Sequence, residues 1–292
     1  MMDLKDAKMV RELPDLVIEP VVRMALAEDL GRCGDVTAQA CIPAEARMKA
    51  QFRARQDGVM AGGAAVRIAC LMMDPAARVD VLVADGEAIA KGDVLVEVDG
   101  SARGLLAAER TALNILGRMC GIATQTAQYV KAVEGSGARI ADTRKTTPGL
   151  RALEKHAVAC GGGINHRFGL DDAILIKDNH VAVCGGVGKA VRAAKAFAPH
   201  LMKVEVEVDG LDQLDEAIAE QPDVIMLDNF TLEDMREAVA RVKQSGVKLV
   251  LEASGGVNLS TVADIAATGV DVISVGALTH SVIQLDIGLD AI

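Results

Sequence analysis

The chain contains no tryptophan and few other aromatic residues, with one tyrosine and four phenylalanines among 292 residues. Hydrophobic residues nevertheless make up 51% of it. The core must therefore be built from alanine, valine, leucine, isoleucine and methionine, which is typical of parallel sheets and the helices that cover them. A chain of this length can bury one large core, or a barrel with a smaller partner domain. The composition therefore favours an α/β protein.

A surplus of positive charge is also missing, because the formal net charge is -10. This excludes bulk electrostatic attraction to nucleic acid or to an anionic membrane surface. No uncharged apolar run approaches the roughly 20 residues that span a bilayer. The opening stretch "MMDLKDAKMVRELPDLVIEP" alternates charged and apolar residues, so we expect no secretory signal there. We therefore expect a protein that binds neither nucleic acid nor membrane.

Closely spaced cysteine pairs are absent as well. The cysteines are scattered without any C-x-x-C pair, at Cys33, Cys41, Cys70, Cys120, Cys160 and Cys184. This spacing fits neither a zinc site nor a small disulfide scaffold. We interpret the cysteines as reduced core thiols of a cytoplasmic protein.

Two patterns divide the chain. Up to about residue 105, a helical segment at 19–30 precedes strand-like stretches at 49–63 and 78–100, the latter with the period-2 apolar residues and turn signals of antiparallel strands. A helical pattern follows over 104–134, and short β runs then alternate with helical runs. The expected strands are 138–143, 173–178, 203–209, 223–229, 247–256 and 270–280. Repeated β/α units predict a parallel sheet, closed or nearly closed as a barrel.

Polar side chains recur where these predicted strands end, which is where such barrels carry their reactive face. They are Arg144, Lys145, Lys177, Glu205, Glu207, Asp228 and Asn229, followed by the stretches "EASGG" and "SVGALT". Any one of them is also compatible with a solvated charge or a helix cap. The whole set, at the same end of successive strands, predicts a ligand site.

The chemistry of this set indicates a ligand with several negative charges. Glycine-rich loops after the last strands present backbone N–H groups to a phosphate. The carboxylates of Glu207 and Asp228 suit Mg²⁺ or sugar hydroxyls. Basic side chains that suit carboxylates or phosphates are Arg144, Lys145, His166, Arg167 and Lys177. Together they predict a ligand with a phosphate end, a hydroxylated middle and a polyanionic end.

Several stretches give the chain a resemblance to a known family. They are "EDLGRCGDVT", "AERTALNILGRMCGIAT", "DTRKTTPGLRALEKHAVACGGGINHRFGLDDAILIKDNH", "VEVEV", "IMLDN" and "LEASGG". On these residues the chain resembles the quinolinate phosphoribosyltransferases over essentially its whole length. It departs from their usual pattern at Cys120 and Asp171, where serine is expected.

The resemblance implies the fold of a type II phosphoribosyltransferase. An N-terminal α/β sandwich domain is expected over 1–115, completed by about 280–292, and an open α/β (TIM-like) barrel over 116–279. The implied activity is that of a nicotinate-nucleotide pyrophosphorylase of NAD biosynthesis. Quinolinate and phosphoribosyl pyrophosphate, with Mg²⁺, would give nicotinate mononucleotide, pyrophosphate and CO₂. At least a homodimer is implied, in which Arg110 reaches the neighbour's site; dimer and hexamer remain alternatives.

The resemblance also assigns roles to individual residues. The catalytic residues would be Lys145, Glu207 and Asp228, and the last two would meet the ribose and Mg²⁺, directly or through water or substrate. The 5′-phosphate would be held by Ser254, Gly255, Val275 and Gly276. The full substrate-binding set is Arg110, Thr143, Arg144, Lys145, His166, Arg167, Lys177, Glu207, Asp228, Ser254, Gly255, Ser274, Val275 and Gly276.

The chemistry of the implied reaction agrees with these residues. Displacing pyrophosphate builds positive charge on the ribose and negative charge on the leaving group, and carboxylates and cations stabilise these opposite halves. The ribosylated ring nitrogen is cationic, which favours loss of the adjacent carboxylate as CO₂. Lys145 and solvent are alternative donors of the proton that the ring then needs.

Three other interpretations stay open at this point. A Schiff-base lyase would use Lys145 or Lys177 as an activated amine. A relative associated with molybdate transport would keep the fold but take another substrate. A catalytically silent binding or scaffold protein has no physical need for polar strand ends arranged as a site. The stretches TRKTTPG, GGGINHR and IKDNH together favour the quinolinate enzyme.

Overall fold

The computed structural model describes residues 10–292, so the start of the stretch for which we expect no secretory signal, residues 1–9, lies outside the described residues. The chain divides into two compact units. The first comprises the chain up to Ala127 together with Thr146–Gly162 and Leu278–Ile292, and the second comprises Gln128–Lys145 and Gly163–Ala277. The domain bounds expected from the resemblance, 1–115 and 116–279, stay a prediction.

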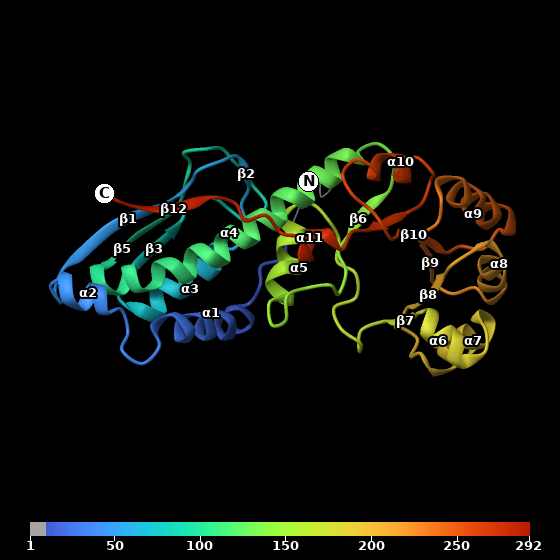
Figure 1. The fold of residues 1–292 in the computed structure, drawn as a ribbon, viewed down its shortest axis with the longest axis horizontal. Coiled ribbons are helices and arrows are strands. Elements are labelled where there is room, and N and C mark those ends of the chain that lie inside the picture. The colour runs from blue at the N-terminus through green and yellow to red at the C-terminus, as the bar shows by residue number, and fades with distance from the viewer. Residues whose placement is uncertain (1–9) are drawn as a thin grey trace, which may run out of the picture. The chain divides into compact units, whose positions relative to one another are not determined.

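The first unit contains an antiparallel four-stranded sheet in the order β12-β1-β5-β3. Its strands are β1 (Arg47–Ala54), β3 (Arg78–Val81), β5 (Val94–Ser101) and β12 (Ile287–Ala291). A short antiparallel pair joins β2 (Gly58–Val59) to β4 (Ala88–Ile89). The antiparallel pattern expected before residue 105 is thus confirmed. Figure 1 shows β12, at the carboxyl terminus, running beside β1.

Helices cover this sheet. They are α1 (Asp15–Leu30), α2 (Val36–Cys41), α3 (Gly63–Met73), α5 (Arg151–Cys160) and α4 (Ala102–Ala132), whose last residues belong to the second unit. Helix α3 packs on β3 and β5, and α1 packs on α3. The buried side of α1 consists of Ile18, Val22 and Leu26, which share one face because they are four residues apart. The helical segments expected at 19–30 and 104–134 are confirmed.

The second unit is built on six parallel strands in the order β6-β11-β10-β9-β8-β7. The strands are β6 (Arg139–Ala141), β7 (Ile174–Ile176), β8 (Val204–Val208), β9 (Val224–Asp228), β10 (Val250–Ser254) and β11 (Val272–Ser274). Each lies within a stretch expected to be a strand. The order leaves β6 and β7 as the edges, so this is an open barrel, and the expected fold class is confirmed.

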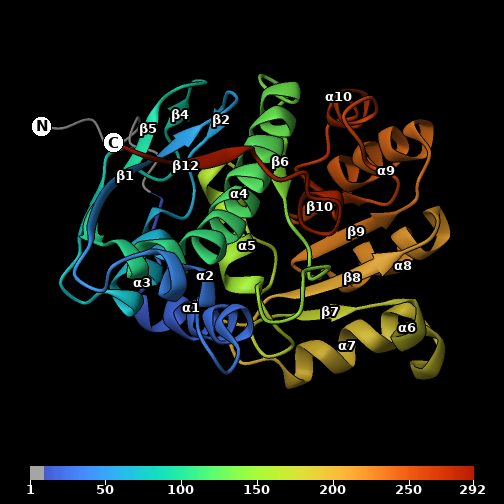
Figure 2. The same ribbon diagram turned by 60° about the vertical axis from the view of Figure 1, so that its left-hand side comes forward.

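Helices connect the strands of the barrel. They are α6 (Asp178–Cys184), α7 (Val187–Phe197), α8 (Leu211–Glu220), α9 (Leu232–Ser245), α10 (Val262–Ala266) and α11 (Ala277–His280), which runs into the first unit. Figures 1 and 2 show α7, α8 and α9 along the outer side of β7, β8 and β9. Helix α9 begins where the Thr231 hydroxyl accepts the N–H of Asp234, and it ends at Gly246, whose φ is 70°.

Strand β8 shows how the barrel separates its apolar and polar side chains. Successive side chains of a strand point to opposite faces. Val204, Val206 and Val208 therefore share one face, and Glu205 and Glu207 share the other, while α7 and α8 pack on the strand. All five residues are buried. The valines suit the helix-covered face, so the two carboxylates point to the inside of the barrel.

The cysteines correct one expectation. All six are free thiols, but Cys33, Cys41 and Cys184 are exposed, so only half of them belong to a core. Cys41 and Cys184 end the short helices α2 and α6, where a small side chain packs against little else. Across residues 10–292, no helix combines the length and the apolar character that a membrane crossing requires.

Candidate active site

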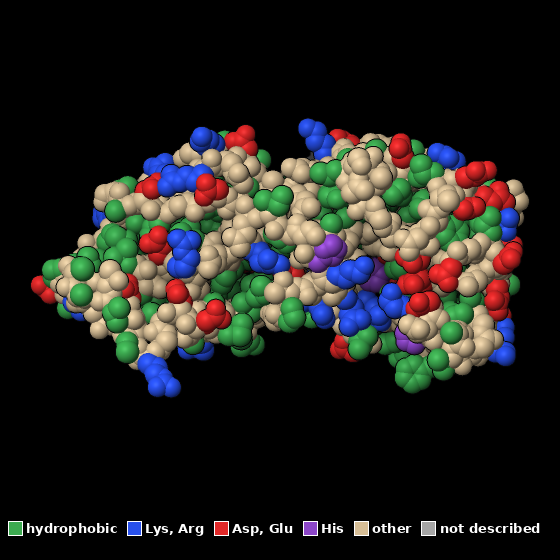
Figure 3. Space-filling model, in the orientation of Figure 1, with side chains coloured by type: hydrophobic (Ala, Val, Ile, Leu, Met, Phe, Trp, Pro, Cys, Tyr) green, Lys and Arg blue, Asp and Glu red, His purple; other side chains and the backbone are tan. Residues whose placement is uncertain are grey.

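A cavity of about 580 Å³ lies in the second unit, at the carboxyl ends of the barrel strands. The residues of the expected substrate-binding set that line it are Thr143, Arg144, Lys145, His166, Arg167, Lys177, Glu207, Asp228, Ser254, Gly255 and Ser274. The lining residues outside that set are Leu175, Met226, Asn229, Glu252 and Gly256. Asn229, and the stretch "EASGG" that contains Glu252 and Gly256, were among the polar strand ends noted in the sequence. Figure 3 shows Lys and Arg side chains gathered next to Asp and Glu side chains on this unit. The cavity therefore has a basic side and an acidic side.

The basic side of the cavity contains two adjacent guanidinium groups. Burial lowers the pKa of Arg167, and the nearby charge of Arg144 lowers it further. Arg167 Nη1 donates to the carbonyl of Ala173 at 3.0 Å. The buried Nε atoms of Arg144 and Arg167 have no hydrogen-bond partner within the described residues. Two like charges with unused donors are suited to an anionic ligand.

Lys177 and Lys145 stand at two further strand ends of the cavity. Lys177 directly follows β7, and its ammonium nitrogen lies 2.8 Å from Glu207 Oε2. Lys145 is exposed, and its backbone N–H donates to the Thr143 hydroxyl at 3.0 Å. The cavity therefore has one lysine held against a carboxylate and another that reaches solvent.

Two carboxylates, Glu207 and Asp228, line the acidic side of the cavity, and a third, Asp209, lies beside them. Oxygen atoms of Glu207, Asp209 and Asp228 all lie within 4.8 Å of one another. Carboxylate oxygens are the donors that Mg²⁺ prefers, so this group fits the metal that the resemblance implies. Asp209 was missed in the sequence analysis, although it directly follows the "VEVEV" strand. Its position at that strand end was the signal for it.

A tight glycine turn follows β10. Gly255 has φ 94° and Gly256 has φ 63°, which is the left-handed region that glycine tolerates best. A Cβ atom on Gly255 would lie 2.1 Å from Oδ1 of Asn229, which itself has φ 54°. Only glycine fits here, and the backbone of this turn lines the cavity.

A buried histidine lies between two buried glutamates at the floor of the cavity. His166 Nε2 is 3.0 Å from Glu205 Oε2 and 3.7 Å from Glu252 Oε1. His166 Nδ1 accepts the backbone N–H of Arg167 at 2.8 Å. Burial, followed by the charge of Glu205, raises the pKa of Glu252 to about 7. Both ring nitrogens of His166 thus have protein partners, whereas we expected this residue to bind substrate anions.

Asp142 holds the loop that carries these residues. It directly follows β6, and its side chain is fully buried. One carboxylate oxygen accepts the N–H of His166 at 2.8 Å, and the other accepts the amide of Asn165 at 2.7 Å. Glu205 was noted in the sequence as a polar strand end and Glu252 only within the stretch "EASGG", whereas Asp142 was not singled out. Their signal was an acidic residue in or directly after an apolar strand, where a charge must have a buried partner.

Three residues of the expected substrate-binding set do not line the cavity. Arg110 is exposed on α4, in the first unit. Val275 is buried, and its N–H donates to the Ala141 carbonyl at 2.9 Å, so that donor is used within the sheet. Gly276 directly precedes α11. The roles expected for these three residues stay predictions.

A second cluster of potential metal ligands lies in the first unit. Ligand atoms of Asp85, His156 and Cys160 lie within 4.8 Å of one another. Asp85 also accepts the N–H groups of Gly62 and Gly63, at 2.9 and 3.3 Å, where α3 begins. Its carboxylate therefore already has partners, and we interpret this cluster as part of the core.

Comparisons with known proteins agree over both units. The family model of the quinolinate phosphoribosyl transferase N-terminal domain matches residues 35–120, and that of the C-terminal domain matches residues 122–290. The nicotinate-nucleotide pyrophosphorylase (carboxylating) of Mycobacterium leprae is 51% identical over 274 residues, covering 92% of this chain and 95% of that protein. A mitochondrial quinolinate phosphoribosyltransferase (decarboxylating) of Nicotiana tabacum is 41% identical over 292 residues, covering 94% and 82%.

A solved structure also agrees with this fold. The nicotinate-nucleotide pyrophosphorylase of Francisella tularensis superposes with a TM-score of 0.91 at 38% identity, covering 98% of this chain and all of that one. The resemblance noted on the sequence motifs is therefore confirmed. The chain belongs to the quinolinate phosphoribosyltransferase family.

Proposed function

We propose that this protein transfers the phosphoribosyl group of phosphoribosyl pyrophosphate to the ring nitrogen of quinolinate. Pyrophosphate leaves, one carboxylate is lost as CO₂, and nicotinate mononucleotide is formed. The observation that carries the proposal is a cavity that sets two adjacent guanidinium groups beside Glu207 and Asp228, with Asp209 close to both carboxylates. The names of the similar proteins support this substrate pair over a molybdate-associated one.

The two guanidinium groups suit a dicarboxylate. Arg144 and Arg167 repel each other in the absence of an anion, and each has a buried Nε atom without a partner. A carboxylate accepts two parallel N–H bonds from one guanidinium. Quinolinate carries two carboxylates, so each arginine would have a partner of its own. A monocarboxylate such as nicotinate would leave one cation unpaired.

The three carboxylates suit the ribose and its metal. Glu207, Asp209 and Asp228 would hold Mg²⁺, directly or through water or the substrate, or accept hydrogen bonds from sugar hydroxyls. When bound, Mg²⁺ neutralises charge on the pyrophosphate leaving group. The carboxylates also stabilise the positive charge that develops on the anomeric carbon. Backbone groups of the glycine turn at Gly255 would approach the 5′-phosphate.

Decarboxylation needs little from the protein beyond positioning. The ribosylated nitrogen is cationic and stabilises the carbanion left by CO₂, so the remaining step is protonation of that ring carbon. Lys145 lines the cavity and is exposed, which makes it one candidate donor, and solvent is the other. Lys145→Met should slow product formation only if the lysine delivers the proton or binds substrate. A solvent isotope effect that persists in the variant would favour solvent.

We further propose a homodimer, or a larger assembly of dimers, in which Arg110 completes the partner's cavity. Its support is that Arg110 is exposed and does not line the cavity of its own chain. Arg110→Ala and Glu207→Gln chains should each be inactive alone. An equal mixture of the two variants should recover about one quarter of wild-type activity. About half of its dimers contain one chain of each kind, and each such dimer has one intact site of its two. No recovery after verified mixing would contradict a shared site.

A reducing compartment, the cytoplasm, also belongs to the proposal. Three of the free cysteines are exposed and would be open to oxidation elsewhere. Protein isolated under a thiol-trapping reagent should show all three labelled. A disulfide found by mass spectrometry in freshly trapped protein would contradict this.

The deciding experiment mixes purified protein with quinolinate, phosphoribosyl pyrophosphate and Mg²⁺ and follows nicotinate mononucleotide, pyrophosphate and CO₂ together. The three products should appear in equal amounts. Nicotinate in place of quinolinate is the control, and we expect little turnover with it. Folded protein that turns over neither substrate would refute the proposed function.

A further inference from the structure

His166 lies between two buried carboxyl groups. Its Nδ1 accepts the backbone N–H of Arg167 at 2.8 Å. Its Nε2 lies 3.0 Å from Glu205 Oε2 and 3.7 Å from Glu252 Oε1. One ring nitrogen thus faces two carboxyl groups.

Glu252 is buried and only partly hydrogen-bonded. It is 4% exposed, and its Oε1, like that of Glu205, accepts no hydrogen bond within the described residues. The groups that face it are the carboxylates of Glu205 and Asp142, the His166 ring and the Ser274 hydroxyl. Its parallel-strand neighbours on β9 and β11, Met226 and Val272, are apolar. A negative charge on Glu252 is thus opposed by burial and by two acids.

Two groups favour the ionised form of Glu252, the His166 ring and the Ser274 hydroxyl. Glu252 also lines the same cavity as Arg144 and Arg167. A dicarboxylate bound to the arginines would bring further negative charge into the cavity that Glu252 lines. This charge makes the protonated carboxyl the more stable form.

We propose that binding of a dicarboxylate in this cavity is coupled to uptake of a proton by Glu252. The geometry that carries the proposal is one imidazole shared between two buried carboxyl groups, in the cavity that Arg144 and Arg167 line. The inference rests on the proposed function, because quinolinate is the dicarboxylate. Glu252 acts here as a positioning residue: its charge adjusts so that the arginines can take both carboxylates of the substrate.

The balance of charge sets the pH range of the coupling. The pKa of Glu252 is about 7 without ligand, and a bound dianion raises it. Uptake should reach about half a proton per site near pH 7 and vanish at low pH, where Glu252 is already protonated. Above pH 7 the dissociation constant should rise about tenfold per pH unit, until the pKa of the complex is passed.

Calorimetry tests the coupling without turnover. Quinolinate is titrated into the full-length protein, without phosphoribosyl pyrophosphate, in buffers of different ionisation enthalpy at one pH. The slope of the apparent binding enthalpy against the buffer enthalpy gives the protons taken up. Glu252→Gln keeps the shape but cannot ionise, so its slope should be zero and its affinity flat between pH 7 and 9. Glu233→Gln, on the exposed side of α9, should behave like wild type.

Each outcome decides the question. A wild-type slope of zero at pH 7, with a clear heat of binding, would overturn the coupling, and so would an undiminished slope in Glu252→Gln. If that variant does not fold, the wild-type slope measured from pH 5.5 to 9 decides alone, because it must pass through a maximum. Binding without turnover would refute the proposed function and leave the coupling measurable. If neither quinolinate nor phthalate binds, both proposals fail.

Discussion

The ammonium nitrogen of Lys177 lies 2.8 Å from Oε2 of Glu207, so the basic and acidic sides of the cavity meet at this ion pair. Glu207 is 8% exposed in its side chain and Lys177 is 48% exposed. The carboxylate is therefore the fixed partner, and the lysine is the one that can move. A cation that binds Oε2 of Glu207 would replace this lysine, whose exposed ammonium group would then be available to an anionic ligand.

Replacing this lysine tests its part in substrate binding. Lys177→Met should lower kcat/KM for quinolinate about 30-fold, since one charge-assisted hydrogen bond contributes about 2 kcal/mol. Steady-state kinetics at saturating phosphoribosyl pyrophosphate measures this. Lys189→Met, which removes an exposed lysine of α7, is the control and should lose little. Equal losses in both variants would show that the effect is one of net charge.

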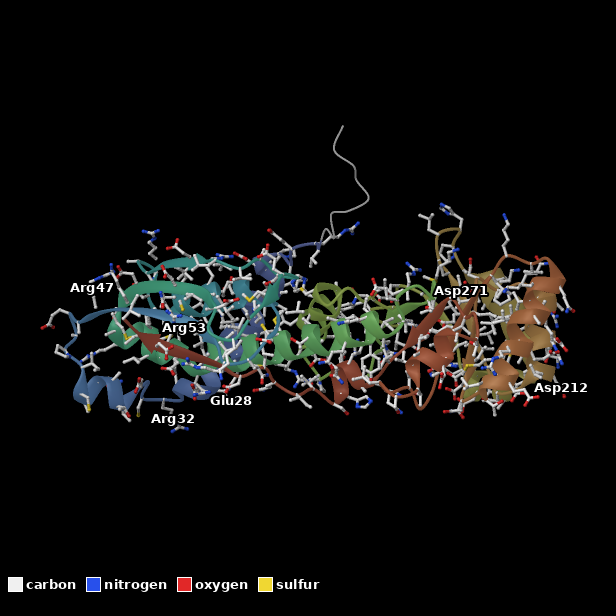
Figure 4. The ribbon with its side chains drawn as sticks, turned by 90° about the horizontal axis from the view of Figure 1, so that it is seen from above. Glu28, Arg32, Arg47, Arg53, Asp212 and Asp271 are labelled. Atoms are coloured by element: carbon white, nitrogen blue, oxygen red, sulfur yellow. The ribbon has the colours of Figure 1, made fainter. Side chains whose placement is uncertain are left out.

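The acidic group predicts a dependence on Mg²⁺ that involves Asp209. Asp209→Asn should raise the half-saturating Mg²⁺ concentration about tenfold, because one of three clustered carboxylates loses its charge. Isothermal titration of Mn²⁺ gives a second measure that does not depend on turnover. Asp212→Asn is the matched control, since Asp212 is exposed in the first turn of α8 (Figure 4). An unchanged metal requirement in Asp209→Asn would remove this residue from the site.

The glycine turn predicts a steric effect. Gly255→Ala would place a Cβ atom 2.1 Å from Oδ1 of Asn229 at a φ of 94°, so the turn must shift. We expect KM for phosphoribosyl pyrophosphate to rise at least about tenfold, because the strained turn should lower the binding free energy by more than about 1.4 kcal/mol. Gly210→Ala has open space around its Cβ atom and should be neutral. Wild-type kinetics in Gly255→Ala would show that this backbone does not approach the substrate.

A buried ion pair in the first unit predicts a loss of stability. Arg118 Nε lies 2.9 Å from Glu154 Oε1, and Glu154 is 1% exposed. Arg118→Met leaves that carboxylate without its charged partner and should lower the free energy of unfolding by about 3 kcal/mol. Urea denaturation measures it. Arg23→Met removes an exposed pair with Glu19 and should cost less than about 1 kcal/mol.

Asp85 predicts a loss of stability in acid. Burial opposes its ionisation, but hydrogen bonds from His156, Gly62 and Gly63 outweigh burial and lower the pKa of Asp85 below 3.8. A lowered pKa stabilises the fold at pH values above 3.8, and this contribution disappears as the pH falls through the lowered value. Asp85→Asn should therefore destabilise the protein more at pH 7 than at pH 3, by urea denaturation. Asp29→Asn, at an exposed position of α1, should show no such difference.

The barrel could be predicted from the sequence because its strands carry a strong local pattern. "KVEVEVD" and "DVIMLDN" are short apolar runs between helical segments, and both became parallel strands where expected. The antiparallel pattern at 78–100 was also local, and β3 pairs with β5 there. The exposed cysteines were not predictable, because burial of a small side chain depends on what packs against it.

The candidate site could be predicted from the sequence only in part, because some of its residues depend on contacts between distant strands. Arg144, Lys177 and Asp228 were recognisable as strand ends, where side chains from distant parts of the chain converge. Asp142 and Glu252 were hidden in apolar stretches, since their effect depends on a neighbour on another strand. The register of β8, β9 and β10 sets Glu207 and Glu252 on either side of Met226, and no local pattern encodes that register.

The sequence by itself determined the α/β class, the order of the barrel strands along the chain and the cationic and acidic residues that end them. These properties depend on periodicity and composition within short segments, which act before the chain is folded. The tertiary structure alone decided which charges meet. It paired Lys177 with Glu207 and set His166 between two buried carboxyl groups. Such contacts depend on distance and burial across the fold, because electrostatic energies change with both.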